Sequence, residues 1–535
     1  MQLTQMTSYL PSPIELGLPA KFTSWRPRQE EGIFEILDQK KRFLALAAPT
    51  GFGKSPVYIA AAVLSGKRVA VLTSTKPQQD QLRTDFSCIN GFIDIRGQNN
   101  YRCNLLEDRW VSVEKGPCHS GIKCDLLRDG CSFFDLHRRV RQAQIVVTNY
   151  QFWLHQAKLD PTRNLGPVDI LICDEAHDAR DQLGDFLKIE ITRDDFTLVG
   201  EKKIPSFKKF SEWQAAAHCW LGSLQHELLV LETRVAEMGH DHTRVPQIII
   251  DLIRHGKNLE RRLTTLTQTA TEWISQTKHE VVSFDPVWPA EYNFSLFGDV
   301  PQIVLTSAVI RPKDLELLGI KPEDSRFVEY PSSFPTKNRP VIHVPSVRMD
   351  KKTTPVNRDI WLEVIEAIIE PRQNWKAIIH TVSFERARWL QNNSRFGKHF
   401  LVNNSWNTAA IIEQFRASSA PTILVSPSVS TGLGFAYDEC RYQIICKVPF
   451  PDTSDLVLQA RCNRDRQFHE SVAAQLIVQS SGRSNRYEDD WSEVFIVDEH
   501  FKWLFRKSPQ FFPKFFREAL RFSEIIPEPL GLRRK

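Results

Sequence analysis

The chain has 535 residues, more than a single hydrophobic core usually serves, so two to four domains are expected. Its composition, 41% hydrophobic and 25% charged residues, is that of an ordinary folded protein, and no uncharged apolar run is long enough to cross a bilayer. The net charge of +5 suits phosphate-bearing partners, but many proteins that never bind nucleic acid share it. Composition therefore argues against a membrane-spanning chain and leaves the partner open.

The first eighteen residues carry neither the basic nor the apolar region of a secretory signal, so we expect a cytoplasmic protein. In that compartment the ten cysteines are poor disulfide candidates. Four of them cluster locally, a pattern that indicates metal binding or catalysis.

Short apolar runs alternate with helical stretches in two series, which predicts an α/β fold with two parallel sheets. The first series comprises residues 43–47, 69–73, 145–149, 169–173 and 303–306, and the second comprises residues 377–380, 422–425, 443–447 and 494–498. Two segments interrupt the first series. Residues 100–141 are rich in cysteine, and residues 190–285 have apolar residues at helical spacing, the pattern of a core-facing helical insert.

A glycine-bearing loop, Ala-Pro-Thr-Gly-Phe-Gly-Lys-Ser, follows the first strand and precedes an apolar helix, which is the context of a phosphate-binding loop. The glycines let backbone N–H groups turn onto the phosphates of ATP, the lysine adds a cation, and the serine hydroxyl can hold Mg²⁺. The candidate nucleotide ligands here are Thr50, Gly51, Gly53, Lys54 and Ser55.

An apolar strand at residues 169–173 runs into Asp174-Glu175-Ala176-His177. We expect Asp174 to hold Mg²⁺ through water and Glu175 to orient and deprotonate the attacking water. Both acids are needed, because one neutralises charge while the other activates the nucleophile.

Residues 479–486 read Gln-Ser-Ser-Gly-Arg-Ser-Asn-Arg. Arg483 and Arg486 are three residues apart, which predicts one helical face and suits arginine fingers supplied by a second lobe. We include Gln479 among the catalytic candidates. This segment would complete an ATP site between two lobes.

With these motifs in this order, the chain resembles a superfamily 2 helicase and, within it, the XPD/DinG family of iron-sulfur helicases. Further segments resemble the family's Q motif (residues 25–29), motif Ia (71–76), motif III (305–308), Ser-Pro-Phe element (330–335), motif IV (378–381) and motif V (425–432). By this resemblance Gln29 would read adenine, and motif III would couple hydrolysis to movement.

The resemblance also suggests where DNA is held. The hydroxyls of Thr73, Ser74, Ser426 and Ser428 suit phosphate contacts, which position a strand without reading its sequence. The chain departs from the family at residues 431–434, where Thr-Gly-Leu-Gly replaces a common Glu-Gly-Ile-Asp, so processive unwinding is less secure than ATP hydrolysis. Val309 in place of a usual threonine is a smaller change.

The clustered cysteines are separated by fourteen, five and six residues: Cys103, Cys118, Cys124 and Cys131. This spacing lacks the paired CxxC knuckles of structural zinc and by itself leaves zinc and iron-sulfur equally open. The segment lies between motif Ia and Asp-Glu-Ala-His, where the family inserts its cluster domain, and this position favours a 4Fe-4S cluster. His119 and His137 keep a mixed Cys/His zinc site as the rival.

The resemblance implies two RecA-like parallel-sheet lobes, with an Fe-S cluster domain and a helical arch inserted in the first. The expected boundaries are 1–99, 142–189 and 286–340 for the first lobe, 100–141 for the cluster domain, 190–285 for the arch and 341–535 for the second lobe.

The implied function is an ATP-dependent DNA helicase that moves 5′ to 3′, uses ATP, Mg²⁺ and a 4Fe-4S cluster, and acts as a monomer on single-stranded and forked DNA. A translocase without unwinding activity shares every motif and stays open. A nucleic-acid-binding scaffold with a degenerate ATPase is the other alternative. The presence of all the expected catalytic lysine, acids and arginines argues against it.

Overall fold

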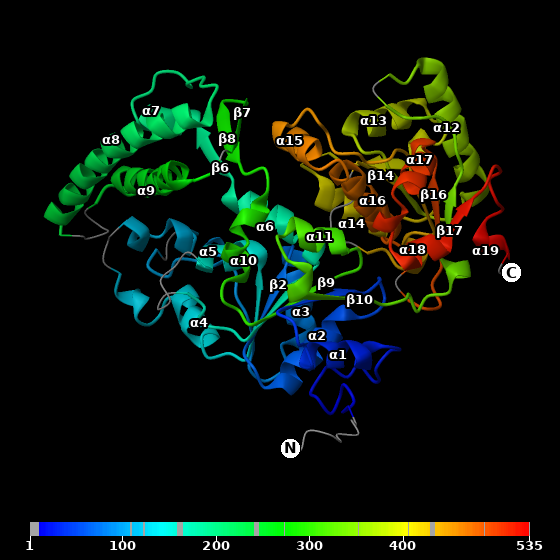
Figure 1. The fold of residues 1–535 in the computed structure, drawn as a ribbon, viewed down its shortest axis with the longest axis horizontal. Helices are drawn as coiled ribbons and strands as arrows, with labels where there is room; N and C mark the ends of the chain where they lie inside the picture. Colours follow the sequence, from blue (N-terminus) through cyan, green and yellow to red (C-terminus); the bar gives the residue numbers. More distant parts are fainter. Residues whose placement is uncertain are drawn as a thin grey trace.

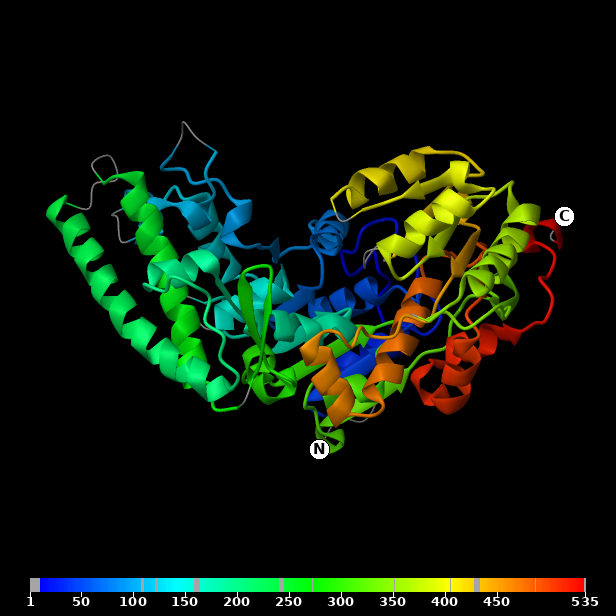
Figure 2. The same ribbon diagram turned by 90° about the horizontal axis from the view of Figure 1, so that it is seen from above.

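The computed structural model describes residues 10–106, 110–120, 124–157, 164–239, 245–271, 273–350, 352–404, 406–427, 434–485 and 487–533. They form two α/β lobes and a long helical insertion that projects from the first lobe (Figures 1 and 2). Among these residues, none of the helices is both long enough and apolar enough to span a membrane.

Lobe 1 is built on a seven-stranded sheet in the order β10-β1-β9-β5-β2-β4-β3, and every neighbouring pair is parallel. Its strands are β1 (Phe43–Ala47), β2 (Val69–Thr73), β3 (Phe92–Asp94), β4 (Ile145–Asn149), β5 (Ile170–Asp174), β9 (Gln302–Ser307) and β10 (Ser325–Glu329). The central strands are continuous apolar runs because helices cover both faces of a parallel sheet. All five residues of β1, β2 and β5 are buried.

Lobe 2 repeats this plan, with a second all-parallel sheet in the order β13-β14-β12-β15-β16-β11-β17. Its strands are β11 (Val341–His343), β12 (Ala377–His380), β13 (Phe400–Val402), β14 (Ile423–Ser426), β15 (Tyr442–Ile445), β16 (Glu493–Ile496) and β17 (Leu520–Phe522). Two parallel sheets confirm the predicted fold class.

Helices flank both sheets. In lobe 1 they are α1 (Gln29–Leu37), α2 (Lys54–Ser65), α3 (Lys76–Phe86), α4 (Ser132–Val140), α5 (Tyr150–Ala157), α6 (Ala179–Leu187), α10 (Phe294–Phe297) and α11 (Pro312–Leu317). In lobe 2 they are α12 (Pro355–Ile369), α13 (Phe384–Asn393), α14 (Thr408–Ala417), α15 (Leu456–Arg464), α16 (Phe468–Ser481), α17 (His500–Lys507), α18 (Lys514–Ala519) and α19 (Leu530–Arg533). Helices α6, α11, α15 and α16 lie where the two lobes meet (Figure 1).

The insertion contains α7 (Arg193–Leu198), α8 (Phe210–Glu237) and α9 (Gln247–Gln268), with α8 and α9 side by side (Figures 1 and 2). It also contains an antiparallel sheet in the order β6-β8-β7, formed by β6 (Ile189–Thr192), β7 (Ile274–Lys278) and β8 (Val281–Asp285). The sequence interpretation of this segment as helical missed that sheet, because its strands are short and the helical stripe dominates the pattern.

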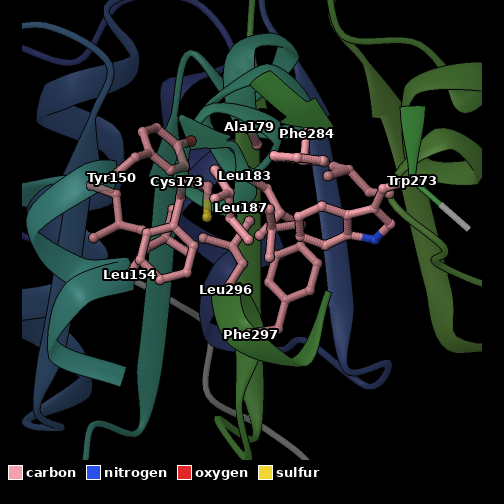
Figure 3. Close-up of a cluster of buried hydrophobic side chains, with 14 of the residues drawn as sticks. Tyr150, Leu154, Cys173, Ala179, Leu183, Leu187, Trp273, Phe284, Leu296 and Phe297 are labelled. Atoms are coloured by element: carbon pink, nitrogen blue, oxygen red, sulfur yellow. The ribbon is translucent and has the colours of Figure 1, made fainter. Parts of the chain in front are cut away.

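The insertion shares a core with lobe 1 rather than hanging from it by a linker. The apolar stripes of α8 and α9 are buried in one cluster with the side chains of α5, α6 and β5. Figure 3 shows Trp273 and Phe284 of the insertion beside Leu183 and Phe297 of lobe 1. The base of the insertion is therefore fixed on the lobe.

Candidate functional site

The phosphate-binding loop joins β1 to α2 and depends on two glycines. Gly51 has a φ of 84° and Gly53, the N-cap of α2, has a φ of 76°, in the left-handed region that only glycine adopts without strain. A Cβ at residue 51 would lie 1.9 Å from Cζ of Phe334, a residue of the segment leading to lobe 2. The loop is therefore held between the lobe 1 sheet and that segment.

Gln29 is buried and braces this loop. Its side-chain amide donates to the carbonyl oxygens of Phe52 (2.8 Å) and Gly53 (3.1 Å), and its Oε1 accepts from the backbone N–H of Arg26 (2.8 Å). Both ends of the amide are thus engaged with the backbone. Recognition of adenine by Gln29 stays a prediction.

Asp174 is the last residue of β5 and Glu175 follows it, and both lie near Lys54 at the start of α2. The Nζ of Lys54 lies 3.5 Å from Oε1 of Glu175, and the hydroxyl of Tyr58 donates to Oδ2 of Asp174 at 3.1 Å. Burial, reinforced by the neighbouring Glu175 charge, raises the pKa of Asp174 to about 6. Burial acts in the same direction on Glu175, but Lys54 and His177 outweigh it and hold the pKa of that carboxyl well below its usual range.

Ser307, the serine of the predicted motif III, connects Glu175 to His177. Its hydroxyl donates to Oε2 of Glu175 at 3.2 Å and lies 2.6 Å from Nδ1 of His177. The Nε2 of His177 lies 3.1 Å from Oδ1 of Asp178. Burial opposes a charge on His177, yet the two carboxylates overcome it and raise the pKa of the imidazole to about 10. The ring is therefore a cation near neutral pH, in contact with the candidate base.

Lobe 2 reaches this network through the end of α16. The amide of Gln479 contacts Nε2 of His177, and Gly482 packs against Thr50 of the phosphate-binding loop. Burial lowers the pKa of Arg483, and the charges of Glu175 and Asp178 act against that effect, so the guanidinium lies within electrostatic reach of the lobe 1 acids. Arg486 lies outside the described residues.

The buried His380 of the predicted motif IV lies behind Arg483. Its Nε2 is 3.0 Å from Oε1 of Gln443, whose amide nitrogen donates to Ser484 at 2.7 Å. Burial, with a smaller contribution from the Arg483 charge, lowers the pKa of His380 to about 4. A neutral imidazole therefore supports the segment that carries Arg483.

The four clustered cysteines lie in the segment between β3 and β4. Cys103 and Cys131 are buried, and Cys118 and Cys124 are half-buried. Burial raises the pKa of the Cys118 thiol to about 11, and the other three cysteines act in the same direction, so the four sulfurs share one neighbourhood. A Cβ on Gly116 would come within 3.3 Å of Cys103 Sγ and 3.6 Å of Cys118 Sγ, so the backbone itself lines the space between the thiols.

The candidate histidine ligands receive no support. His137 is buried, and its Nε2 is 3.2 Å from Oε1 of Gln156. The side chain of His119 lies outside what the structure describes. Among the described residues, no three His, Cys, Asp or Glu side chains converge on a point that could hold one metal ion.

Two protein families match the chain, one on each lobe: the type III restriction enzyme res subunit over residues 22–200, and the helicase C-terminal domain over residues 379–519. Each match covers part of one half of the chain, and neither spans half of the whole sequence. A probable ATP-dependent helicase of Methanocaldococcus jannaschii is 26% identical over 176 residues, which is 27% of this chain and 26% of that relative. The match thus spans about a quarter of the relative's length.

Solved structures share the fold of this chain at low sequence identity. An XPD helicase superposes with a TM-score of 0.63 at 14% identity, covering 93% of this chain and 99% of that one. Xpd4 of S. tokodaii superposes with a TM-score of 0.57 at 13% identity, covering 93% of this chain and all of that one. The likeness confirms that the two sheets are RecA-like lobes.

The residues predicted to hold DNA are mostly buried where the structure describes them. Thr73 is fully buried and its hydroxyl donates to the carbonyl of Thr148 at 3.2 Å, and Ser426 is buried at the end of β14. Their burial is at odds with the predicted phosphate contacts. The hydroxyl oxygen of Ser74 is buried as well, but it makes no hydrogen bond to any described residue. Ser428 lies outside the described residues, as does most of the divergent segment 431–434.

Two contributors to the candidate ATP site were not predicted from the sequence. Tyr58 lies four residues after Lys54, on the same face of α2, which is why its hydroxyl reaches Asp174. Ser307 was quoted only as part of a motif, and its link between Glu175 and His177 depends on β9 lying beside β5 in the sheet. The i, i+4 spacing could have identified Tyr58, whereas the strand order could not be read from the sequence.

Proposed function

We propose that the protein is an ATP-dependent DNA helicase that moves 5′ to 3′ along single-stranded DNA. The observation that supports this best is an ATP site assembled from both lobes. Lys54 and Glu175 pair within lobe 1, the charge of Glu175 acts on Arg483 of lobe 2, and the amide of Gln479 contacts His177 between the lobes. Because the site is complete only when the lobes meet, hydrolysis is linked to their relative position.

Each group in this site has a chemical role in the proposal. The loop N–H groups and Lys54 bind the phosphates of ATP. Ser55 and Asp174 hold Mg²⁺, and Tyr58 orients the Asp174 carboxylate. Glu175, kept ionised by Lys54 and His177, takes the proton of the attacking water, and Arg483 neutralises the charge that develops on the phosphoryl group.

The four cysteines fit an iron-sulfur cluster by their donor chemistry and their shared space. We propose that Cys103, Cys118, Cys124 and Cys131 hold a 4Fe-4S cluster. A single zinc ion would draw four sulfurs to within about 4 Å of one another, whereas a four-iron cube needs a wider set. The cluster would stabilise a small domain that has few helical residues of its own.

The rest of the proposal concerns the partners, the oligomeric state and the location of the protein. The partners are single-stranded and forked DNA, and the helicase acts as a monomer in the cytoplasm. None of the ten described cysteines forms a disulfide, which suits a reducing compartment.

The test uses anaerobically purified protein. ATP hydrolysis is measured with and without single-stranded DNA, iron and zinc are quantified on the same sample, and strand separation is measured on duplexes with a 5′ or a 3′ overhang. The proposal expects DNA-stimulated hydrolysis, about four irons per chain and separation of the 5′-overhang substrate only. A Lys54→Ala variant is the control for contaminating ATPases.

The other outcomes identify the rivals. Hydrolysis and displacement of a protein block from single-stranded DNA, without strand separation, would identify a translocase. Hydrolysis that DNA does not stimulate would favour the scaffold. Zinc in place of iron would overturn the cluster while leaving the motor intact.

A further inference from the structure

The segment that follows motif III leaves lobe 1 and enters lobe 2. Val309 is 4% exposed and packs in a hydrophobic cluster whose other buried members, among them Ile477 and Val478 of α16, all belong to lobe 2. Its backbone N–H donates to the Ser307 hydroxyl at 3.1 Å. One short stretch of chain therefore contacts the ATP-site network at one end and the core of the opposite lobe at the other.

Arg311, two residues further on, is inserted into lobe 2 as well. Its guanidinium donates to the carbonyl oxygen of Ser471 and to Oε1 of Gln475, each at 2.7 Å, and lies 5.7 Å from the ring centre of Phe511. The positive charge of Arg311 is neutralised by Asp314, also in lobe 1, which accepts two hydrogen bonds of 3.1 and 2.9 Å from the guanidinium. The side chain is 5% exposed.

The contacts on α16 are regularly placed. Gln475 and Gln479 are four residues apart, so they lie one above the other on the same helical face. Gln475 binds Arg311 and Gln479 contacts His177. Both lobe 1 partners are connected to Ser307. The side chain of His177 contacts the Ser307 hydroxyl, and Arg311 is joined to Ser307 by the intervening chain. Two residues on one face of α16, Gln475 and Gln479, are therefore each connected to Ser307 through a lobe 1 partner.

We propose that Arg311 is a positioning residue that fixes the register between motif III and α16, and so passes the state of the ATP site to lobe 2. The inference deepens the proposed helicase function and depends on it. The ion pair with Asp314 stays within lobe 1 when the lobes part, so no isolated charge is left behind. The bonds to lobe 2 go to neutral acceptors, which water can replace. The contact is therefore specific but reversible, as a moving joint requires.

The decisive variant is Gln475→Met, which removes the acceptor on α16 without touching the Arg311–Asp314 pair. A hydrogen bond from a charged donor is lost, so we expect the stimulation of hydrolysis by DNA to fall by about tenfold, with basal hydrolysis and the KM for ATP within about twofold of wild type. Gln475→Glu supplies a stronger acceptor for the guanidinium and should retain stimulation.

Asp465→Asn is the matched control. It removes a different contact between the lobes, the ion pair of 2.8 Å between Asp465 and Lys313. Its DNA stimulation should stay within about twofold of wild type, because Lys313 keeps its ion pair of 2.7 Å with Glu316. Equal losses in both variants would mean that any contact between the lobes matters, and would overturn the specific role of Arg311.

A second readout needs no DNA. The increase in the thermal unfolding midpoint on adding a non-hydrolysable ATP analogue reports closure of the lobes, and Gln475→Met should reduce it while Asp465→Asn should not. If wild type is not stimulated by DNA, the helicase proposal fails, and this shift still tests the link. A Gln475→Met protein with normal stimulation, or with an undiminished shift, would overturn the inference.

Discussion

Substituting Gly51 by alanine tests how tightly the phosphate-binding loop is held against the segment that leads to lobe 2. The new Cβ would lie 1.9, 2.5 and 2.8 Å from three ring atoms of Phe334. The ring is 6% exposed and is held among its neighbours, so it cannot swing into solvent without disturbing the loop. The residue also keeps a φ of 84°, which alanine adopts only with strain.

Two costs add in this variant. The left-handed backbone costs a non-glycine residue about 1–2 kcal/mol, and an extra methyl in a packed contact costs about 1–3 kcal/mol. The loop must therefore distort at a cost of at least about 2 kcal/mol, which corresponds to a loss of about 30-fold or more in affinity for an ATP analogue. Isothermal titration calorimetry measures that affinity directly.

Two further variants separate the causes. Gly66→Ala places alanine at a φ of 64° at the opposite end of α2 from the loop, with no atom within 4 Å of the new Cβ, so the backbone cost should lower the stability of the fold and leave the affinity unchanged. Combining Gly51→Ala with Phe334→Ala removes the collision and should recover about tenfold of the lost affinity. Unchanged affinity in the single variant, or no recovery in the double variant, would refute the assignment of the Phe334 ring as the obstacle.

Three other predictions concern charge, metal and the insertion. The pKa of His177 is raised to about 10, so the contribution of its charge to stability is complete below pH 6.5 and is lost as the pH rises through 10. The unfolding free energies of wild type and His177→Asn, measured by denaturant titration, should therefore converge over that pH range. Cys131→Ser should lose its iron while Cys219→Ser, an exposed cysteine, keeps it, as metal analysis will show. Asp195→Asn should destabilise the insertion by about 2 kcal/mol. The loss is smaller than for a fully buried ion pair, because the partner Arg262 is 29% exposed. Hydrogen exchange of the amides of α8 and α9 measures the loss of stability.

The sequence predicted the elements that carry long, uninterrupted signals. The central strands of both sheets are apolar on both faces and stand between helices, so their positions were expected. The missed strands β3, β11, β13 and β17 have three residues each, too few for any periodicity. Strand β10 has five residues, but it lies at a sheet edge and its polar residues hide the pattern.

The candidate site was predictable as a set of residues but not as a set of contacts. Lys54, Asp174 and Glu175 were identified because phosphate chemistry requires those residue types after those strands. Exposure could not be predicted, and for that reason Thr73 and Ser426 were expected to meet DNA although both are buried. The side chain at the last position of a strand can point into the core or toward solvent, and the sequence pattern of these two motifs does not show which.

The departure of this chain from the XPD/DinG motif pattern at Val309 has a physical explanation in the contact between the lobes. A threonine at that position would bring a hydroxyl into a cluster of lobe 2 side chains that offers apolar neighbours, and an unsatisfied buried hydroxyl costs about 1–3 kcal/mol. Valine has the same shape and no such cost, so it strengthens the docking of the motif III segment on α16. Apolar packing alone would let the motif III segment slide along α16. Arg311 fixes its position, because its hydrogen bonds to Ser471 and Gln475 can both form in only one register. The substitution and the arginine together make the end of β9 a fixed point on lobe 2, and a motor needs such a point if a change beside Glu175 is to move the opposite lobe.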